Sequence, residues 1–383
     1  MSLKRNGLMV ILILLLGLAL AACQEEPPPG GQVEVTRLVE VTRIVEPPAE
    51  DGETDGEEAP PGPVGAGAIL QRVRERGRLV CGARTDLPGF GYLDEDGNNA
   101  GFDIDTCRAI AVALFNDPNA VEFVPLTADD RGPALQTAEV DILARNATWT
   151  SSRETQWGNF TLITFYDGQG FIVPADSGIE TIEDLDGATI CVTSGTTTEL
   201  NLADAFRQRG LEFTADTYED TATVYSTYDA GGCDAATSDK SQLAAIQTGL
   251  ADPGAHRILD ITISKEPLTP AVPHGDDQWY DLVRIVLMIL INAEELGVNS
   301  QNVDEMLSSD VFEVRRLLGQ EGEWGQAELG LDADVAANVI REVGNYGEIY
   351  DRYMGPEGAS FTLDRGLNAL WPEGGLIYAP PLR

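Results

Sequence analysis

Apolar and polar residues follow two rhythms along the chain from residue 69 onward. Short apolar runs at 79–83, 121–126 and 140–144 are typical of buried strands. After the first run, apolar residues recur every three or four positions, which predicts a helix that Asp103 caps and that stops before Pro118. This alternation of strand and helix predicts parallel α/β units.

A second series of the same kind begins near residue 189. We expect strands at 189–193, near Phe213 and at 233–237, with helices at 197–208 and 221–229 between them. A repeated α/β series predicts two lobes.

The C-terminal part of the chain has a different pattern. Residues 280–296 are apolar in the middle, but Asp281, Arg284 and Glu294 interrupt the run, so a buried helix is expected there rather than a membrane span. Beyond residue 300 the pattern is helical and rich in loops, which suits a tail wrapped over one lobe.

The N-terminus has the features of an export signal. Lys4 and Arg5 precede an apolar run at 8–22, and the sequence Leu-Ala-Ala-Cys that ends at Cys23 resembles the bacterial lipobox. We therefore expect residues 1–22 to be removed and Cys23 to carry a lipid that anchors the protein to a membrane.

Residues 23–66 are rich in Pro, Gly and acids and contain the repeat VEVTRL-VEVTRI. This stretch is interpreted as a disordered tether, although the repeat could also form a strand or a partner site.

Charge and cysteine content exclude several classes of protein. The formal net charge of −38 argues against nucleic acid as a partner and against docking of the protein face on an anionic membrane. Besides Cys23, four cysteines remain, and an even number in an exported chain predicts two disulfides with three possible pairings. A metal site is the weaker interpretation, because the chain has no CxxC motif and only two histidines.

Candidate ligand groups follow the first and third predicted strands of each lobe. Ligands of open parallel sheets bind beyond the carboxyl ends of such strands. In the second lobe these places hold residues 194–199, where Thr196 and Glu199 resemble a capping box, and the end of 237–239. In the first lobe they hold residues 84–86 and 146–153.

These groups match the two charges of a free amino acid. Arg153 offers a planar, two-pronged donor for a carboxylate, and the amides of Thr196 and Thr197 at a helix start can hold the same group. Asp239 has no evident partner in the sequence and matches the ammonium. Hence the two lobes are expected to bind a zwitterion between them.

Several motifs together resemble the extracytoplasmic solute-binding proteins of polar amino acid ABC transporters, closest to the general L-amino-acid-binding branch. The resemblance covers about residues 70–383. Its motifs are GFDIDTCRAIA (101–111), ARNATWTSSRE (144–154), YDGQGF (166–171), SGTTTELNLADAF (194–206), GCDAATSD (232–239) and GDDQW (275–279).

The resemblance implies the type II periplasmic-binding-protein fold, an α/β fold with two parallel-sheet lobes. Two hinge strands, near 166–173 and 261–272, would join the lobes. The second lobe, 169–265, would be inserted into the first, which would comprise 67–168 and 266–383 with the C-terminal wrap.

The resemblance also implies ligand-binding residues. In the SxSxxxxR pattern of the family, Arg153 occupies the carboxylate-binding position, and Asn146 and Thr148 replace the serines. Asp239 matches the ammonium-binding Asp. Thr196 and Thr197 match the residues that hold the carboxylate from the second lobe.

The side-chain pocket departs from the family pattern. Many relatives have a Ser or Asp and then an aromatic residue after the first strand, whereas this chain has Arg84 and, further on, Leu87 and Phe90. If Arg84 faces the cleft, it favours glutamate or aspartate; if it faces solvent, a broader polar range fits. The implied topology pairs Cys81 with Cys107 and Cys191 with Cys233.

The expected function is the capture of free L-amino acids, polar or acidic, and their delivery to an ABC transporter permease by an exported, monomeric, lipid-anchored protein. No cofactor is expected. An enzyme on the same fold, such as a dehydratase or a peptidoglycan lyase, would need a general acid or base in the cleft. A sensing module that signals to a separate partner is the third hypothesis.

Overall fold

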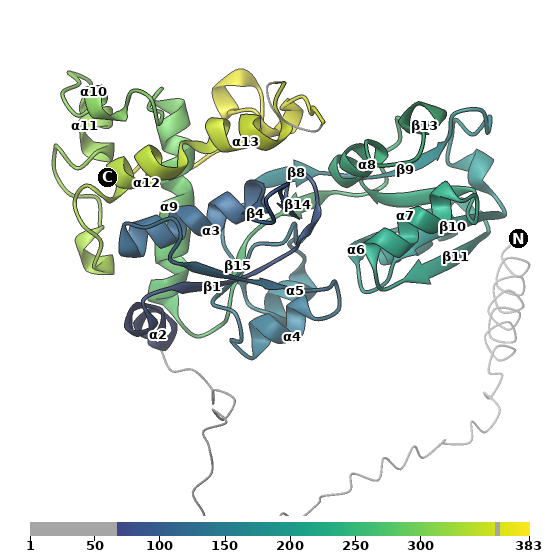
Figure 1. The fold of residues 1–383 in the computed structure, drawn as a ribbon, viewed down its shortest axis with the longest axis horizontal. Helices are drawn as coiled ribbons and strands as arrows, with labels where there is room; N and C mark the ends of the chain where they lie inside the picture. Colours follow the sequence, from purple (N-terminus) through teal and green to yellow (C-terminus); the bar gives the residue numbers. More distant parts are fainter. Residues whose placement is uncertain (1–66, 357–360) are drawn as a thin grey trace, which may run out of the picture. The chain divides into compact units, whose positions relative to one another are not determined.

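The computed structural model describes residues 67–356 and 361–383. The predicted signal, Cys23 and the tether lie outside these residues. In Figure 1, the described chain forms two α/β lobes, as predicted, and each lobe is built around its own five-stranded sheet.

The first lobe is built on a mixed sheet with the strand order β5-β1-β6-β15-β7. Its strands are β1 (Leu79–Ala83), β5 (Val121–Pro125), β6 (Ile142–Leu143), β7 (Asn159–Phe160) and β15 (Ala271–Val272). β1 pairs in parallel with β5 and β6, while β15 runs antiparallel to β6 and β7. The expected first and second strands are confirmed, and the third is shorter than expected.

Helices cover both faces of this sheet. Alternate residues of a strand point to opposite faces, so Leu79 and Cys81 pack in the core that contains α3 (Phe102–Phe115) and α9 (Asp277–Glu295). Val80 packs in the core of the other face with α4 (Arg131–Gln136). The apolar run near residue 280 is therefore a buried helix, as predicted.

The second lobe repeats the scheme with the strand order β11-β10-β12-β9-β13. Its elements are β9 (Gln169–Pro174), β10 (Ala188–Thr193), α6 (Thr197–Arg209), β11 (Phe213–Tyr218), α7 (Thr221–Asp229), β12 (Ala235–Asp239), α8 (Lys240–Gln247) and β13 (His256–Ile258). Residues of α6 pack in the core on one face of the sheet, and residues of α7 and α8 pack in the core on the other. β12 begins two residues later than expected and ends on Asp239.

Two short antiparallel strands connect the lobes. β8 (Phe165–Asp167) leads into β9, and β14 (Glu266–Leu268) leads back toward β15, so both crossings run side by side between the two sheets (Figure 1). A pair of strands with few neighbours is the natural hinge of such a molecule.

The remaining elements surround the first lobe. They are α2 (Ala68–Arg76), β2 (Asp86–Leu87), β3 (Gly91–Leu93), β4 (Asn99–Ala100), α5 (Ser151–Gln156), α10 (Val303–Met306), α11 (Phe312–Leu317), α12 (Val335–Val343) and α13 (Tyr346–Met354). Apolar residues of α11, α12, α13 and the last residues of the chain join the core of the first lobe. Among the described helices, none is long and apolar enough to cross a bilayer.

One predicted cap is wrong. α3 begins at Phe102, after Gly101, whose φ of 131° suits a residue without a side chain. Asp103 lies in the first turn, and its buried carboxylate accepts a hydrogen bond from the Asn146 amide at 2.6 Å. The residue therefore ties α3 to the end of β6 instead of capping the helix.

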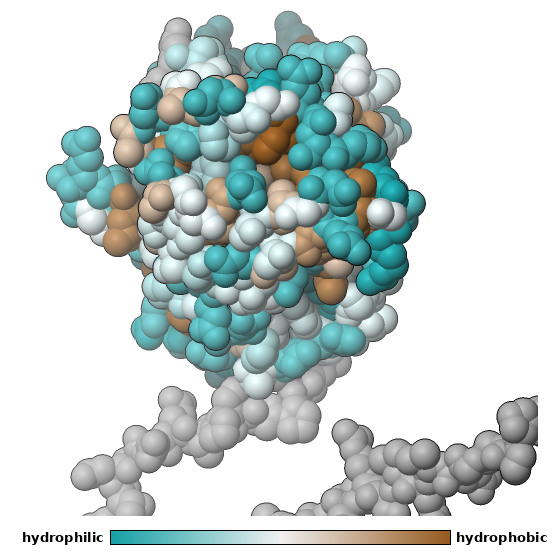
Figure 2. Space-filling view, turned by 90° about the vertical axis from the view of Figure 1, so that its right-hand side faces the viewer, coloured by the Kyte–Doolittle hydropathy of each residue, from teal (hydrophilic) through white to brown (hydrophobic). Residues whose placement is uncertain are grey.

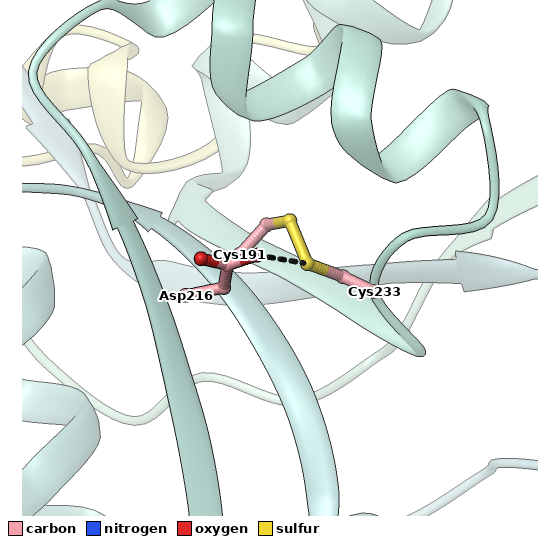
Figure 3. A group of neighbouring side chains, drawn as sticks. All are labelled: Cys191, Asp216 and Cys233. Carbon is pink, nitrogen blue, oxygen red and sulfur yellow. Dashed lines mark hydrogen bonds between the residues drawn. A yellow bond between two sulfur atoms is a disulfide. The ribbon is translucent and has the colours of Figure 1, made fainter.

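Both expected disulfides are present. Cys81 of β1 is joined to Cys107 of α3, and Cys191 of β10 to Cys233, the residue that precedes β12 by two positions. Figure 3 shows the carboxylate of Asp216 beside the second disulfide. Because both sulfurs are bonded to each other, this trio of side chains does not offer two thiolates to a metal.

The surface is mainly hydrophilic on the face drawn in Figure 2. On the face that Figure 2 shows, hydrophobic residues occur in small patches separated by hydrophilic ones. Scattered apolar residues of this kind are normal on a folded protein.

Candidate ligand-binding cleft

A small polar cavity lies between the lobes. The ends of β1, β6, β10 and β12 contribute to its wall, where parallel strands present ligand-binding groups. The lining residues are Arg84, Ala128, Arg131, Arg145, Asn146, Thr148, Thr193, Thr196, Thr197, Thr198, Thr221, Thr237, Ser238, Asp239 and Gln242. Six of the eight predicted ligand residues are among them.

Asp239 is the one carboxylate in this lining. It ends β12, where its backbone pairs with Gln169, and its side chain is buried. Burial raises the pKa of this carboxyl well above its ordinary value, and the neighbouring carboxylates of Asp167 and Glu266 raise it further. Within 67–356 and 361–383, no hydrogen bond or ion pair engages the Asp239 side chain. A buried, unpaired carboxylate that faces a cavity can accept a cationic group.

Three arginines of the first lobe line the opposite side. Arg84 follows β1, Arg145 follows β6, and Arg131 begins α4. All three are buried, at 4%, 6% and 4% exposure, so their charges are only weakly screened by solvent. Burial lowers the pKa of Arg145 to about 9 and that of Arg131 well below its ordinary value, and like charges nearby act in the same direction. An anionic ligand group would relieve this concentration of positive charge.

Arg84 faces the cleft and reaches across it. Its Nε donates to Asp86 at 2.7 Å, and its Nη1 donates to Asn146 of the same lobe at 3.2 Å and to Gln242 of the other lobe at 3.0 Å. Nη2 approaches the Thr221 hydroxyl at 3.4 Å. The Arg84 side chain therefore points into the cleft and not into solvent.

Helix α6 directs its first turn at the cavity. The Thr196 hydroxyl accepts from the Glu199 amide at 3.3 Å, as a capping residue does, and Thr197 is the first helical residue. The Glu199 carboxylate accepts from the Gly195 amide and not from that of Thr196, so the predicted capping box is displaced by one residue. The amides of the first turn remain directed toward the helix start, where an anion is favoured.

Gly195 makes the close approach of the lobes possible. Its φ is 68°, and a Cβ atom at this position would lie 1.8 Å from Oδ1 of Asp129 in the first lobe. Any side chain here would both strain the backbone and push the lobes apart.

Arg153 lies beside the cavity but is not part of its lining. Its Nη1 donates to the Thr148 carbonyl at 3.0 Å, and its guanidinium lies 4.6 Å from the centre of the Trp157 ring. Burial lowers the pKa of Arg153 to about 10, whereas Glu266 and Asp239 act in the opposite direction. Its charge is thus close enough to Asp239 to interact with it.

Glu266 of the hinge joins both lobes. This buried carboxylate accepts from the hydroxyls of Thr148 in the first lobe, at 2.5 Å, and Thr197 in the second, at 3.2 Å. It also accepts from Asn201 of α6 at 2.8 Å, and the two threonine hydroxyls lie 3.3 Å apart. Ser264 also donates to Glu266, so five side chains meet where the chain crosses between the lobes.

The structure corrects the expectation for Phe90. Its ring is 1% exposed and packs in the core of the first lobe, with ring centroids 5.1 Å from Phe165 and 6.5 Å from Phe102. The tight turn before β3 directs this side chain inward, so it does not line the cavity.

Sequence reasoning overlooked Arg131, Arg145, Thr221, Gln242 and Glu266. Arg145 closely follows the third strand, a position already expected to carry ligand groups, so the signal was present. Gln242 is one helical turn after Asp239 and could have been inferred from it. The other three carry no local signal, because their importance depends on how the lobes meet.

The fold and the cleft agree with a match to a protein-family model over residues 79–356. The chain belongs to the bacterial extracellular solute-binding proteins, family 3. It is therefore a type II periplasmic binding protein, and a solute-binding receptor of transport rather than an enzyme.

Similar proteins cover most of the chain. The general L-amino acid-binding periplasmic protein AapJ of Rhizobium johnstonii is 48% identical over 84% of this chain and 95% of its own length. The glutamate/glutamine/aspartate/asparagine-binding protein BztA of Rhodobacter capsulatus is 45% identical over 82% and 94%. A periplasmic binding protein from Brucella ovis, solved with glutathione bound, is 46% identical, covers 83% of this chain and all of its own, and superimposes with a TM-score of 0.80.

Proposed function

We propose that this binding protein captures free L-amino acids, with acidic ones favoured, in the cleft between its lobes and delivers them to an ABC transporter permease. The observation that carries the proposal is the unpaired carboxylate of Asp239 opposite a wall with three buried arginines. The names of AapJ and BztA, which bind amino acids of this range, support it.

The α-carbon groups of the ligand would be held at the second lobe and at Arg153. Asp239 would accept the ammonium, and the first amides of α6, with Thr196 and Thr197, would donate to the α-carboxylate. Arg153 would add a charge-assisted hydrogen bond after turning from the Thr148 carbonyl, with Asn146 and Thr148 beside it. Hydrogen bonds to charged groups contribute about 1.5–3 kcal/mol each, so three of them account for much of a micromolar affinity of about 8 kcal/mol.

The side chain of the ligand would extend toward the first lobe. Arg84 and Arg145 lie on that wall, and the terminal nitrogens of Arg145 have no hydrogen-bond partner in the described part of the chain. A second carboxylate would satisfy these donors, which explains why glutamate and aspartate should bind more tightly than neutral residues of the same size.

Melting temperatures measured with each of the twenty amino acids test this function. A ligand at 100 times its Kd stabilises the folded protein by about 2.7 kcal/mol, so cognate amino acids should raise the melting temperature by several degrees. We expect the largest shifts with glutamate and aspartate. The absence of a shift with all twenty would contradict the proposal.

The location of the protein is a further part of the proposal. Cys23 would carry the lipid that holds the exported protein at the outer face of the cell membrane, because two or more acyl chains give stable anchoring. Cys23→Ser should release the protein into the soluble fraction, and Cys23→Ala should do the same. If both variants remain in the membrane fraction, the lipid anchor is wrong.

A further inference from the structure

Glu266 of the hinge strand β14 is a buried carboxylate that accepts hydrogen bonds from four side chains. It is 1% exposed and has no ion pair with any residue that the structure describes. Its Oε2 accepts from the hydroxyls of Thr148 at 2.5 Å and Thr197 at 3.2 Å. Its Oε1 accepts from Ser264 at 2.5 Å and from Asn201 at 2.8 Å. Because a carboxylate offers about four lone-pair positions, this group is fully satisfied as an ionised acceptor.

The protons of the two threonine hydroxyls are used within this group. A hydroxyl has one proton to donate and two lone pairs to accept with. The hydroxyl oxygens of Thr148 and Thr197 lie 3.3 Å apart, so each proton points either at Glu266 or at the other threonine. In both arrangements no hydroxyl proton is left for a ligand. Both threonines line the cavity, where their hydroxyls can therefore act only as acceptors.

A purely structural role would not require a charge at residue 266. Burial of a carboxylate without a cationic partner is costly, and the amide of glutamine has the same shape. An amide, however, has one acceptor oxygen and two N–H donors of its own, so it cannot accept from four donors at once. The ionised carboxylate is thus the group that fixes the direction of the threonine protons.

These hydroxyls complement Asp239 in the same cavity. The Asp239 carboxylate is buried and has no partner among the described residues, so it adds a third acceptor to the two hydroxyls. A primary ammonium has three N–H donors and no lone pair, which matches three acceptors. A hydroxyl group in the place of the ammonium would have one donor only, and its lone pairs would face those of the threonines. The backbone amide of Thr197 is a separate donor and stays available to the α-carboxylate.

We propose that Glu266 is a positioning residue that makes the hydroxyls of Thr148 and Thr197 acceptors toward the ligand, and so helps the cleft to select amino acids over the corresponding hydroxy acids. Glu266 itself is not part of the cavity lining and acts through the threonines. This inference rests on the proposed function, because it concerns the ammonium of the same ligand.

Two ligands that differ in one group test the inference by calorimetry on the purified full chain. (S)-2-Hydroxyglutarate has the configuration of L-glutamate and a hydroxyl in place of the ammonium. We define the selectivity as the Kd of the hydroxy acid divided by that of L-glutamate, and competition against L-glutamate extends the measurement to weak binding.

Thr197→Val removes one acceptor and keeps the charge and shape of the site. The selectivity should fall about tenfold, because a hydrogen bond to the charged ammonium is lost and the hydroxy acid loses none. A hydroxyl that donates to the α-carboxylate would instead serve both ligands. Equal weakening of the two ligands would therefore overturn the inference.

Glu266→Gln should also lower the selectivity about tenfold, because it releases the threonine protons toward the cavity. The same change in a Thr148→Val/Thr197→Val background should alter the selectivity less than about twofold, since no hydroxyl is left to reorient. The hydroxy acid carries one more negative charge than L-glutamate, so an effect of the lost charge alone would persist in this background and would contradict the proposal. Glu294→Gln, at a carboxylate paired with Arg365 away from the cavity, is the matched control and should leave the selectivity unchanged.

The outcomes separate this inference from the proposed function. If L-glutamate binds to the unaltered protein but Thr197→Val and Glu266→Gln leave the selectivity unchanged, only the role of Glu266 is overturned. If none of the twenty amino acids binds to the unaltered protein, the proposed function fails and the inference fails with it.

Discussion

The two walls of the cleft differ in charge and in the kind of group that they present. The first lobe contributes three buried arginines and no carboxylate to the lining, whereas the second contributes one carboxylate, several hydroxyls and the start of a helix. A zwitterion needs one anchor of each sign. The second lobe provides both, through Asp239 and α6, so the arginines of the first lobe form an additional positive site.

Under the proposed function, this difference assigns separate tasks to the two walls. Asp239 and α6 of the second lobe, together with Arg153, would recognise what all amino acids share, and the three arginines that line the cavity from the first lobe would select among them. The three arginines are buried and their like charges lie close together. An anionic side chain should therefore bind more tightly to them than to the same number of exposed arginines.

The largest effect is expected at the shared anchor. Asp239→Asn keeps the shape of the side chain and removes the charge that faces the ammonium. Loss of one partner of a buried charge pair costs about 2–5 kcal/mol, so the Kd should rise at least tenfold for every amino acid bound. Calorimetry provides the measurement, and Asp176→Asn, at an exposed turn of the same lobe, is the matched control. An unchanged Kd would remove Asp239 from the site.

An intermediate and selective effect is expected in the first lobe. Arg145→Met should weaken glutamate and aspartate about tenfold, because a charge-assisted hydrogen bond is lost, and should weaken glutamine less than threefold. Competition binding on one protein preparation compares the three ligands directly. Arg78→Met, which alters an exposed arginine paired with Glu122, should leave all three affinities unchanged. Equal losses for acidic and amide ligands would show that Arg145 does not select.

The smallest effect concerns pH. The pKa of Asp239 is raised by burial, so protons compete with the ligand ammonium for this carboxylate. Ligand binding requires the ionised form; affinity should therefore increase severalfold as the pH rises from about 5 to 8. L-Glutamine is the suitable ligand because its side chain does not titrate, and Arg145, with a pKa of about 9, stays charged over most of this range. Asp239→Asn should bind weakly with no such slope; a flat profile in the unaltered protein would contradict the role of Asp239.

Part of this site could be predicted because its residues lie at the ends of regular strands and helices. Asp239 ends a strand and Thr196 caps a helix, and both positions can be read from local patterns. The same holds for β1, α6 and the two disulfides, whose partners lie on neighbouring elements.

Other parts depend on contacts between distant segments. Arg131 begins a helix of only six residues, too short for a periodic pattern, and Glu266 becomes central only where the lobes meet. Phe90, in contrast, was expected in the site but lies in the core. An aromatic residue at a turn looks the same in sequence whether its side chain enters the cleft or the core. The sequence pattern predicts Asp103 as the cap of α3, but Gly101 holds that position. The close packing of α3 against β3 leaves no room for a side chain at residue 101.

A crystal structure with L-glutamate bound tests the central claim most directly. The account predicts the ligand ammonium within hydrogen-bonding distance of the Asp239 carboxylate, the α-carboxylate on the first turn of α6 and the Arg153 guanidinium, and the side-chain carboxylate on Arg145. A ligand in the reverse orientation, with its ammonium away from Asp239 and its side-chain carboxylate at α6, would contradict it.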